Sequence, residues 1–248
     1  KIRSCLDYFD TPSVYCFANC VDAIDAVYGP QTKYNIWPDI LDCLMQIFCR
    51  EHFVSGKGGF FNQLKDNITK YYKKCDESVI KWLKLLKQKK TLFLITGSNV
   101  DFASFTATNS MGENWTDLFD SVVFHARKPG FFKDNRPFMG VDGLQETGPI
   151  ILDASNKVKH YSQGNWKEFY DLLSTISNKK DPKILYIGDH LIKDIYTPSK
   201  SQISDTVAVV EEMSVSDEYV EFEKDPYAAL LSSKMWGSFF NINVGYEE

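Results

Sequence analysis

The chain has 248 residues, of which 44% are hydrophobic and 25% are charged, and its formal net charge is −5. This length suits one large domain or a domain with an insert, and the composition excludes disorder, collagen and coiled coil as overall descriptions. A net negative charge argues against general attraction to nucleic acid or to an anionic membrane. No apolar run in the sequence is long enough to cross a bilayer. We therefore expect neither a nucleic-acid partner nor a membrane partner.

Residues 1–75 are predicted to form a helical segment. Apolar residues recur with a period near 3.6 after Pro12, and Gly29-Pro30 ends this pattern. Similar patterns follow Pro38 and a glycine-rich break at 55–59. The sequence therefore predicts three helices, at 12–28, at 38–48 and at about 60–74.

The pattern changes at Asp76, which is a good N-cap for a fourth helix that ends near Lys90. The continuous apolar run at 91–95 is typical of a strand that is buried on both faces. Helical and apolar segments then alternate. The expected helices lie near 101–110, at 165–176 and just after His190, and the expected strands at 121–124, 183–187 and 206–210.

This alternation predicts an α/β fold with a doubly wound parallel sheet. Between residues 138 and 152, glycines and a proline separate short apolar pairs, so we expect a hairpin or flap at the edge of the sheet. Three parts follow from the pattern: a helical segment at 1–75, an α/β core at 76–212, and a C-terminal segment at 213–248 that packs on the core.

In open parallel sheets of this kind, ligands bind beyond the carboxyl ends of the strands. Polar residues follow three predicted strands at this edge: Thr96, Gly97 and Ser98 after the first, Lys128 after the second, and Asp189 with Asp194 after the third. Each has an ordinary alternative, as a helix cap, a lysine in a surface turn or a solvated carboxylate. Together they favour phosphoryl transfer. A hydroxyl and backbone N–H groups bind phosphate oxygens, a lysine neutralises developing charge, and a carboxylate holds Mg²⁺.

The order and spacing of these residues resemble the haloacid dehalogenase-like (HAD) phosphatases. Leu94-Ile95-Thr96 resembles their second motif, Lys128 their third, and Gly188-Asp189 with Asp194 their fourth. Longer runs resemble the cytosolic purine 5′-nucleotidase group within that superfamily, at 126–132, 161–165, 185–190 and 236–240. The resemblance implies a Rossmann-like, three-layer HAD core with residues 1–75 on its cap side. It also implies a cytoplasmic, Mg²⁺-dependent hydrolase of phosphomonoesters, among which nucleoside 5′-monophosphates are candidate substrates.

The resemblance also implies a role for each matched residue. Thr96 and Lys128 would be catalytic, Gly97 and Ser98 would bind the small phosphorylated substrate, and Phe9 would stack on its base. Asp189 would bind the metal ion directly. Asp194 would instead orient the lysine or the water molecules around the ion. The alternative for Phe9 is an ordinary place in the core of the cap.

The sequence departs from this family at the first motif, an Asp-x-Asp pair whose first member is the nucleophile. The acidic pairs Asp7/Asp10 and Asp22/Asp25 have the wrong spacing. We therefore expect the first core strand and its nucleophile to lie outside these residues, on an N-terminal part of the protein that is continuous with the chain or a separate fragment. The alternative is a binding or regulatory protein that keeps the scaffold with little turnover. The sequence is also compatible with a homo-oligomer.

A second departure concerns the substrate. The resemblance places Leu41, Met45 and Phe48 where purine nucleotidases have polar groups that read the base, and Gly97 where they have an amide side chain. A site without those hydrogen-bond partners discriminates poorly between bases. Purine specificity is therefore not expected of this chain.

Overall fold

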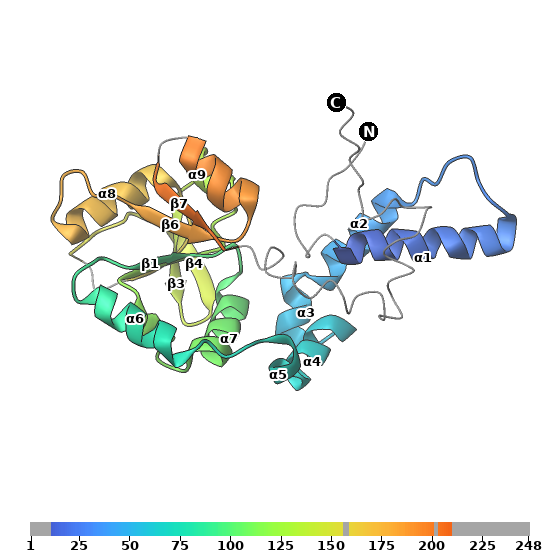
Figure 1. Ribbon diagram of the computed structural model, residues 1–248, viewed down its shortest axis with the longest axis horizontal. Helices are drawn as coiled ribbons and strands as arrows, with labels where there is room; N and C mark the ends of the chain where they lie inside the picture. The colour runs from blue at the N-terminus through green and yellow to red at the C-terminus, as the bar shows by residue number, and fades with distance from the viewer. Residues whose placement is uncertain (1–10, 156–158, 201–202, 210–248) are drawn as a thin grey trace, which may run out of the picture. The chain divides into compact units, whose positions relative to one another are not determined.

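A computed structural model describes residues 11–155, 159–200 and 203–209 of the chain (Figure 1). It contains two compact units, one formed by residues 45–208 and one by residues 1–44 together with 209–248. The larger unit therefore includes residues 45–75, which the sequence pattern groups with the helices that precede them. No helix in the described ranges is long and apolar enough to cross a membrane.

The first two predicted helices are confirmed as α1 (Thr11–Tyr28) and α2 (Trp37–Ile47). The rings of Phe17 and Trp37 meet edge to face with their centroids 5.7 Å apart, and this contact joins the two helices. Between the helices, the hydroxyl of Tyr34 donates a hydrogen bond to a carboxylate oxygen of Asp25 at 2.5 Å.

Residues 45–208 contain the remaining described helices. They are α3 (Arg50–Ser55), α4 (Gly59–Asp66), α5 (Ile68–Tyr71), α6 (Glu77–Lys87), α7 (Val100–Met111), α8 (Trp166–Ser177) and α9 (Thr197–Lys200), with short 3₁₀ turns at Trp115–Leu118 and Gly130–Phe132 and a π-helical turn at Leu191–Tyr196. The single helix predicted at about 60–74 is wrong, because Asn67 divides it. The side-chain amide of Asn67 donates to the Gln63 carbonyl at 3.0 Å, so it competes with the helical backbone.

The main sheet has five strands in the order β1-β2-β5-β3-β4. The strands β1 (Phe93–Ile95), β2 (Ser121–Phe124) and β5 (His160–Gln163) run parallel. The strands β3 (Phe138–Asp142) and β4 (Gln145–Ile150) form an antiparallel hairpin at one edge, as predicted. A second, two-stranded parallel sheet consists of β6 (Leu185–Gly188) and β7 (Asp205–Ala208).

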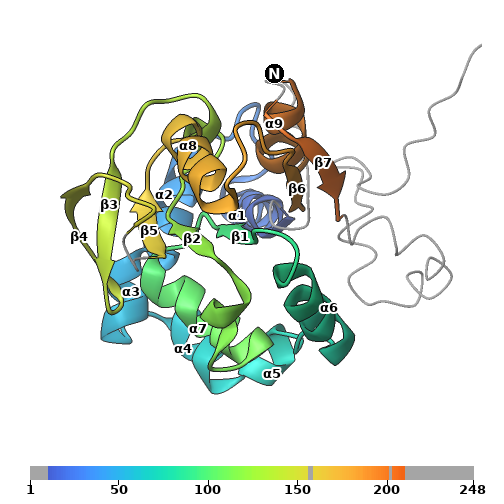
Figure 2. The ribbon, with the colours of Figure 1, turned by 90° about the vertical axis from the view of Figure 1, so that its left-hand side faces the viewer.

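Helices cover both faces of the main sheet (Figure 2). Val123 of β2 packs with Phe169 and Leu173 of α8 on one face. Its neighbours Val122 and Phe124 pack on the other face, where α7 and α6 lie. Because successive side chains of a strand point to opposite faces, this alternation produces three layers. The expected three-layer α/β architecture with a mainly parallel sheet is therefore present.

The two sheets lie next to each other without backbone pairing between them. The rings of Phe93 on β1 and Tyr186 on β6 stack with their centroids 6.5 Å apart. Strand β1 pairs only with β2, and β6 only with β7, within the described part of the chain. The interruption of the sheet thus falls between β1 and β6, the strands that precede Thr96 and Asp189.

Candidate functional site

Two loops that follow β1 and β2 are joined by backbone hydrogen bonds at the carboxyl edge of the main sheet. The Thr96 carbonyl accepts from the amide of Ala126 at 3.0 Å, and the Ser98 carbonyl accepts from the amide of His125 at 2.9 Å. The Thr96 hydroxyl oxygen in turn accepts from the Ser98 amide at 3.1 Å, which leaves its proton available for another acceptor. This pairing fixes the threonine hydroxyl beside the loop that carries Lys128.

The loop after β1 leads directly into the N-terminus of α7. The Asn99 side chain makes no capping hydrogen bond there, and a side chain at Gly97 would meet open space. The first turn is held by Asp101, which is 6% exposed and accepts from the Arg50 guanidinium of α3 at 2.8 Å. Backbone N–H groups at such a helix start favour an anion. The loop at 96–98 therefore suits a phosphate group.

Lys128 reaches across the interruption of the sheet. Its ammonium lies 2.6 Å from a carboxylate oxygen of Asp194, and the two side chains are 14% and 3% exposed. The other carboxylate oxygen of Asp194 accepts from the amide of His190 at 3.3 Å. Lys128 and Asp194, which follow different predicted strands, thus form a buried ion pair.

Tyr186 completes this buried cluster, and the sequence analysis did not identify it. Its hydroxyl donates to Asp194 at 3.0 Å and accepts from the Lys128 ammonium at 3.2 Å. Burial, and then the negative charge of Asp194, raise the pKa of the Tyr186 hydroxyl well above its usual range, so it stays protonated and remains a donor. A tyrosine inside an apolar strand was the available signal, because a buried tyrosine hydroxyl needs a partner.

Gly188, the last residue of β6, makes room for the Asp194 side chain. A Cβ atom at position 188 would lie 2.4 Å from the Cβ atom of Asp194, which is closer than real Cβ contacts allow. Any larger residue here would displace the carboxylate that holds Lys128. This steric requirement explains why glycine stands at position 188, directly before Asp189.

The two carboxylates assigned to the metal differ in their surroundings. Asp194 is buried and both of its oxygens are engaged, so it can orient Lys128 but has no free oxygen for a direct bond to an ion. Asp189 is exposed at the end of β6 and makes no hydrogen bond or ion pair with the described residues. These residues contain no group of three potential metal ligands. Asp189 is thus the one predicted carboxylate that fits an ion such as Mg²⁺, which typically uses one or two carboxylates with several waters.

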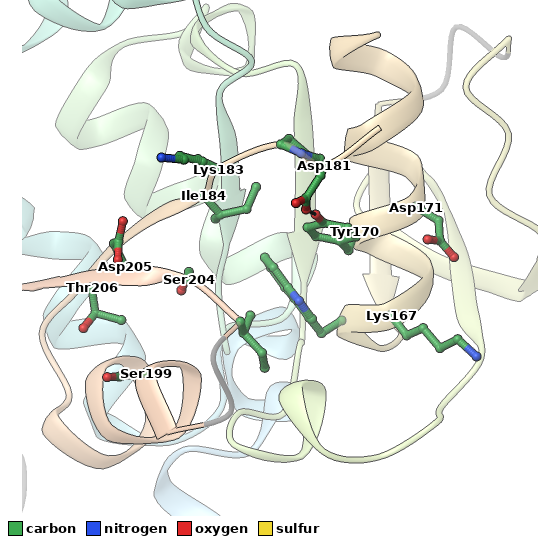
Figure 3. Close-up of a pocket in the computed structure, with 13 residues that line it drawn as sticks. Lys167, Tyr170, Asp171, Asp181, Lys183, Ile184, Ser199, Ser204, Asp205 and Thr206 are labelled. Atoms are coloured by element: carbon green, nitrogen blue, oxygen red, sulfur yellow. Dashed lines mark hydrogen bonds between the residues drawn. The ribbon is translucent and has the colours of Figure 1, made fainter. Parts of the chain in front are cut away.

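Of the other predicted site residues, three lie in the described part of the structure and one does not. Thr96, Gly97 and Ser98 lie together beside the loop of Lys128, while Phe9 lies outside the described residues. A cavity of about 850 Å³ lies elsewhere, between α8, the segment before β6 and the start of β7 (Figure 3). Its wall includes Tyr170, whose hydroxyl donates to Asp181 at 2.5 Å. This cavity opens near the amino ends of β6 and β7, whereas the predicted site residues follow the carboxyl ends of the strands. None of those residues therefore lines the cavity.

Comparison with known proteins identifies relatives over nearly the whole chain. The model of the 5′ nucleotidase family matches residues 1–234. The chain is 34% identical to 5′-nucleotidase domain-containing protein 1 of Homo sapiens, over 96% of this chain and 56% of that protein. It is 32% identical to the Bos taurus protein of that name with the same coverage, and 29% identical to 5′-nucleotidase domain-containing protein 2 of Homo sapiens over 79% of this chain and 36% of that protein. The chain thus spans about half the length of the two relatives named first.

Proposed function

Because this chain belongs to the 5′ nucleotidase family, we propose that it is part of a Mg²⁺-dependent phosphatase that hydrolyses phosphomonoesters. The family name suggests nucleoside 5′-monophosphates as one substrate class. The observation that carries the proposal is the buried pair of Lys128 and Asp194, whose lysine lies on the loop that is hydrogen-bonded to Thr96 and Ser98. A buried ion pair of this kind also stabilises the fold, so the kinetic effect of removing the lysine charge is what tests its part in phosphoryl transfer.

Each residue has a distinct task in the proposed reaction. The Thr96 hydroxyl and the backbone N–H groups at the start of α7 hold oxygens of the phosphoryl group. The Lys128 ammonium neutralises the negative charge that these oxygens carry in the transition state. Asp194 and Tyr186 keep the ammonium in place before substrate binds, so that little reorganisation is needed at the moment of reaction.

The nucleophile comes from outside the described residues in this proposal. An aspartate carboxylate attacks phosphorus, while the second aspartate of the Asp-x-Asp pair gives a proton to the ester oxygen, which leaves as the alcohol. Water then attacks the aspartyl phosphate and releases inorganic phosphate, which restores the carboxylate. Residues 11–155, 159–200 and 203–209 offer no Asp-x-Asp pair after a strand to perform the first step.

We place that aspartate on a parallel strand between β1 and β6. Both strands have an unpaired edge within the described ranges, although backbone groups inside a sheet are normally paired. The side chains of Leu185 and Ile187 on β6 are 56% and 47% exposed, which is unusual for a strand of an α/β core. An added strand would pair both edges, and the part of the protein that carries it would cover these side chains. Relatives of nearly twice this length leave ample chain to supply it.

Asp189 is the residue of this chain that we propose as a ligand of Mg²⁺. When bound, the ion neutralises part of the charge on the phosphoryl oxygens. Asp194 does not contact the ion in this proposal and instead orients Lys128.

The proposal is tested with the full-length protein and an aryl phosphate. We expect steady hydrolysis in the presence of Mg²⁺, loss of hydrolysis when EDTA removes the metal, and recovery when Mg²⁺ is added in excess. Residues 1–248 alone should release no phosphate, because the nucleophile is absent. Released inorganic phosphate is the quantity to measure.

A Thr96→Val preparation of the full-length protein serves as the control for contaminating phosphatases, since valine keeps the shape and removes the hydroxyl. Activity that is equal in both preparations would show that the chemistry does not occur at this loop. Absence of turnover by the full-length protein would favour the alternative of a binding or regulatory protein built on the same scaffold.

A further inference from the structure

A second polar cluster lies at the carboxyl ends of β2 and β5, beside the loop that carries Lys128. Glu146 of β4 is at its centre and accepts hydrogen bonds from Ser162, from Gln163 at 3.1 Å and from His125 at 3.2 Å. The far nitrogen of the His125 ring, Nε2, accepts from Nε of Arg127 at 3.2 Å. The cluster therefore ends in a guanidinium next to Lys128 in the chain.

The backbone of this cluster adopts an uncommon conformation. His125, Arg127 and Gln163 have φ angles of 45°, 51° and 59°, although none of them is glycine. Residues other than glycine avoid this region at an energetic cost, and such residues concentrate at functional sites. Three of them at the ends of two neighbouring strands indicate that the surrounding contacts hold this arrangement for a reason other than stability.

The hydrogen bonds determine how the Arg127 side chain is presented. Because Nε2 of His125 accepts from Arg127, the proton of the neutral ring lies on Nδ1, which donates to Glu146. The hydrogen bonds from Ser162, Gln163 and His125 lower the pKa of the Glu146 carboxyl despite its partial burial, so Glu146 stays ionised. Arg127 thus uses only Nε in this contact, and its two terminal nitrogens keep their protons for another acceptor.

Those terminal nitrogens have no carboxylate partner among the described residues, and the Arg127 side chain is exposed. The backbone before Arg127 is fixed to the phosphate loop, because Ala126 and His125 donate to the carbonyls of Thr96 and Ser98. A guanidinium with a free fork binds carboxylate and phosphate groups through paired hydrogen bonds. Arg127 directly precedes Lys128 in the chain. The two side chains extend toward His125 and Asp194, so a substrate that meets both must carry two separated anionic groups.

We propose that Arg127 is a second anion-binding residue of this site, and that the preferred substrates carry a carboxylate or a second phosphate in addition to the ester phosphate. His125 and Glu146 are positioning residues that hold the Arg127 guanidinium at the carboxyl edge of the sheet. The inference rests on the proposed phosphatase function, since it assigns the first anion to the loop at 96–98 and to Lys128. It narrows the substrate class from phosphomonoesters in general to phosphomonoesters with two anionic groups.

The test uses the full-length protein and phosphonates, which bind without being hydrolysed. Benzylphosphonate is compared with its 3-carboxy and 4-carboxy derivatives by calorimetry, so that no single spacing of the two anions is assumed. We expect the better carboxylated ligand to bind about tenfold or more tightly than benzylphosphonate, as a charged hydrogen-bonded contact allows. Arg127→Ala should remove this preference, and His125→Asn, which tolerates the same backbone angles, should reduce it.

Lys133→Ala is the matched control, because it removes an exposed positive charge from the same loop region and should keep the preference. Equal affinity of wild type for all three ligands would overturn the inference and leave the phosphatase proposal standing. If Arg127→Ala still binds the carboxylated ligand more tightly than benzylphosphonate, the inference is also overturned. This outcome counts even if the variant is less stable than wild type, because the two affinities are compared within one variant. If no phosphonate binds and no aryl phosphate is hydrolysed, the inference falls together with the proposed function.

Discussion

We expect the substitution Lys128→Met to lower kcat of the full-length protein on an aryl phosphate by about 100-fold or more. Methionine keeps much of the length and packing of the side chain but has no charge. The ammonium lies 2.6 Å from Asp194 before substrate binds, so it is held ready to move to a phosphoryl oxygen. Because charge on those oxygens is largest in the transition state, the loss should fall mainly on kcat and less on KM.

The matched control is Lys133→Met, which makes the same chemical change at an exposed lysine of the neighbouring turn. It should leave kcat and KM close to wild type, since surface substitutions away from special contacts have little effect. Steady-state kinetics at saturating Mg²⁺ measures both. If kcat of Lys128→Met stays within a few-fold of wild type, Lys128 has no part in the chemistry, and the strongest support for phosphoryl transfer is lost.

The second large effect concerns stability. We expect Asp194→Asn to lower the free energy of unfolding of the full-length protein by about 3 kcal/mol, because removing one member of a buried pair leaves the other charge uncompensated. Both side chains are largely buried, at 14% and 3% exposed, so solvent screens this pair weakly. Denaturation in urea, followed by the fluorescence of the tryptophans, measures the change.

A double-mutant cycle separates the lost charge pair from a general disturbance of packing. The double variant Lys128→Met with Asp194→Asn should be more stable than Asp194→Asn alone, because neither charge is then left unpaired. Tyr186→Phe removes only the hydroxyl of the cluster and should cost about 1 kcal/mol. A double variant that is as unstable as the sum of the two single variants would contradict the stabilising role of the pair.

The convergence of these polar residues could be predicted because it depends on a general rule of parallel sheets. Polar residues that follow apolar runs meet at the carboxyl edge, and this rule predicts from the sequence that Thr96, Lys128 and Asp194 lie near one another. The contact between Lys128 and Asp194 bears this out. The enclosure of Asp194 by Tyr186 and His190 is visible only in the structure, because sequence spacing alone does not distinguish an exposed carboxylate from a buried one.

Strand β5 could not be predicted by the same reasoning. It has four residues, His160–Gln163, and three of them are polar, so it lacks the apolar run of a central strand. Its place is set by its neighbours, because β2 and β3 pair with its two edges and bury Ser162 completely. The link between His125 and Glu146 could not be predicted for a related reason, because the two residues are 21 positions apart and only the β3–β4 hairpin brings them together.

In our proposal, a strand from another part of the protein lies between β1 and β6 and carries the nucleophile. Its most direct test is a structure of the full-length protein with Mg²⁺ and beryllium fluoride, which mimics a phosphoryl group on a carboxylate. We expect a parallel strand paired with both β1 and β6, with an aspartate at its carboxyl end bonded to beryllium. Lys128 and Thr96 should contact the fluorides, and Mg²⁺ should contact Asp189. Direct pairing of β1 with β6, or an intervening strand without an aspartate at that end, would contradict it.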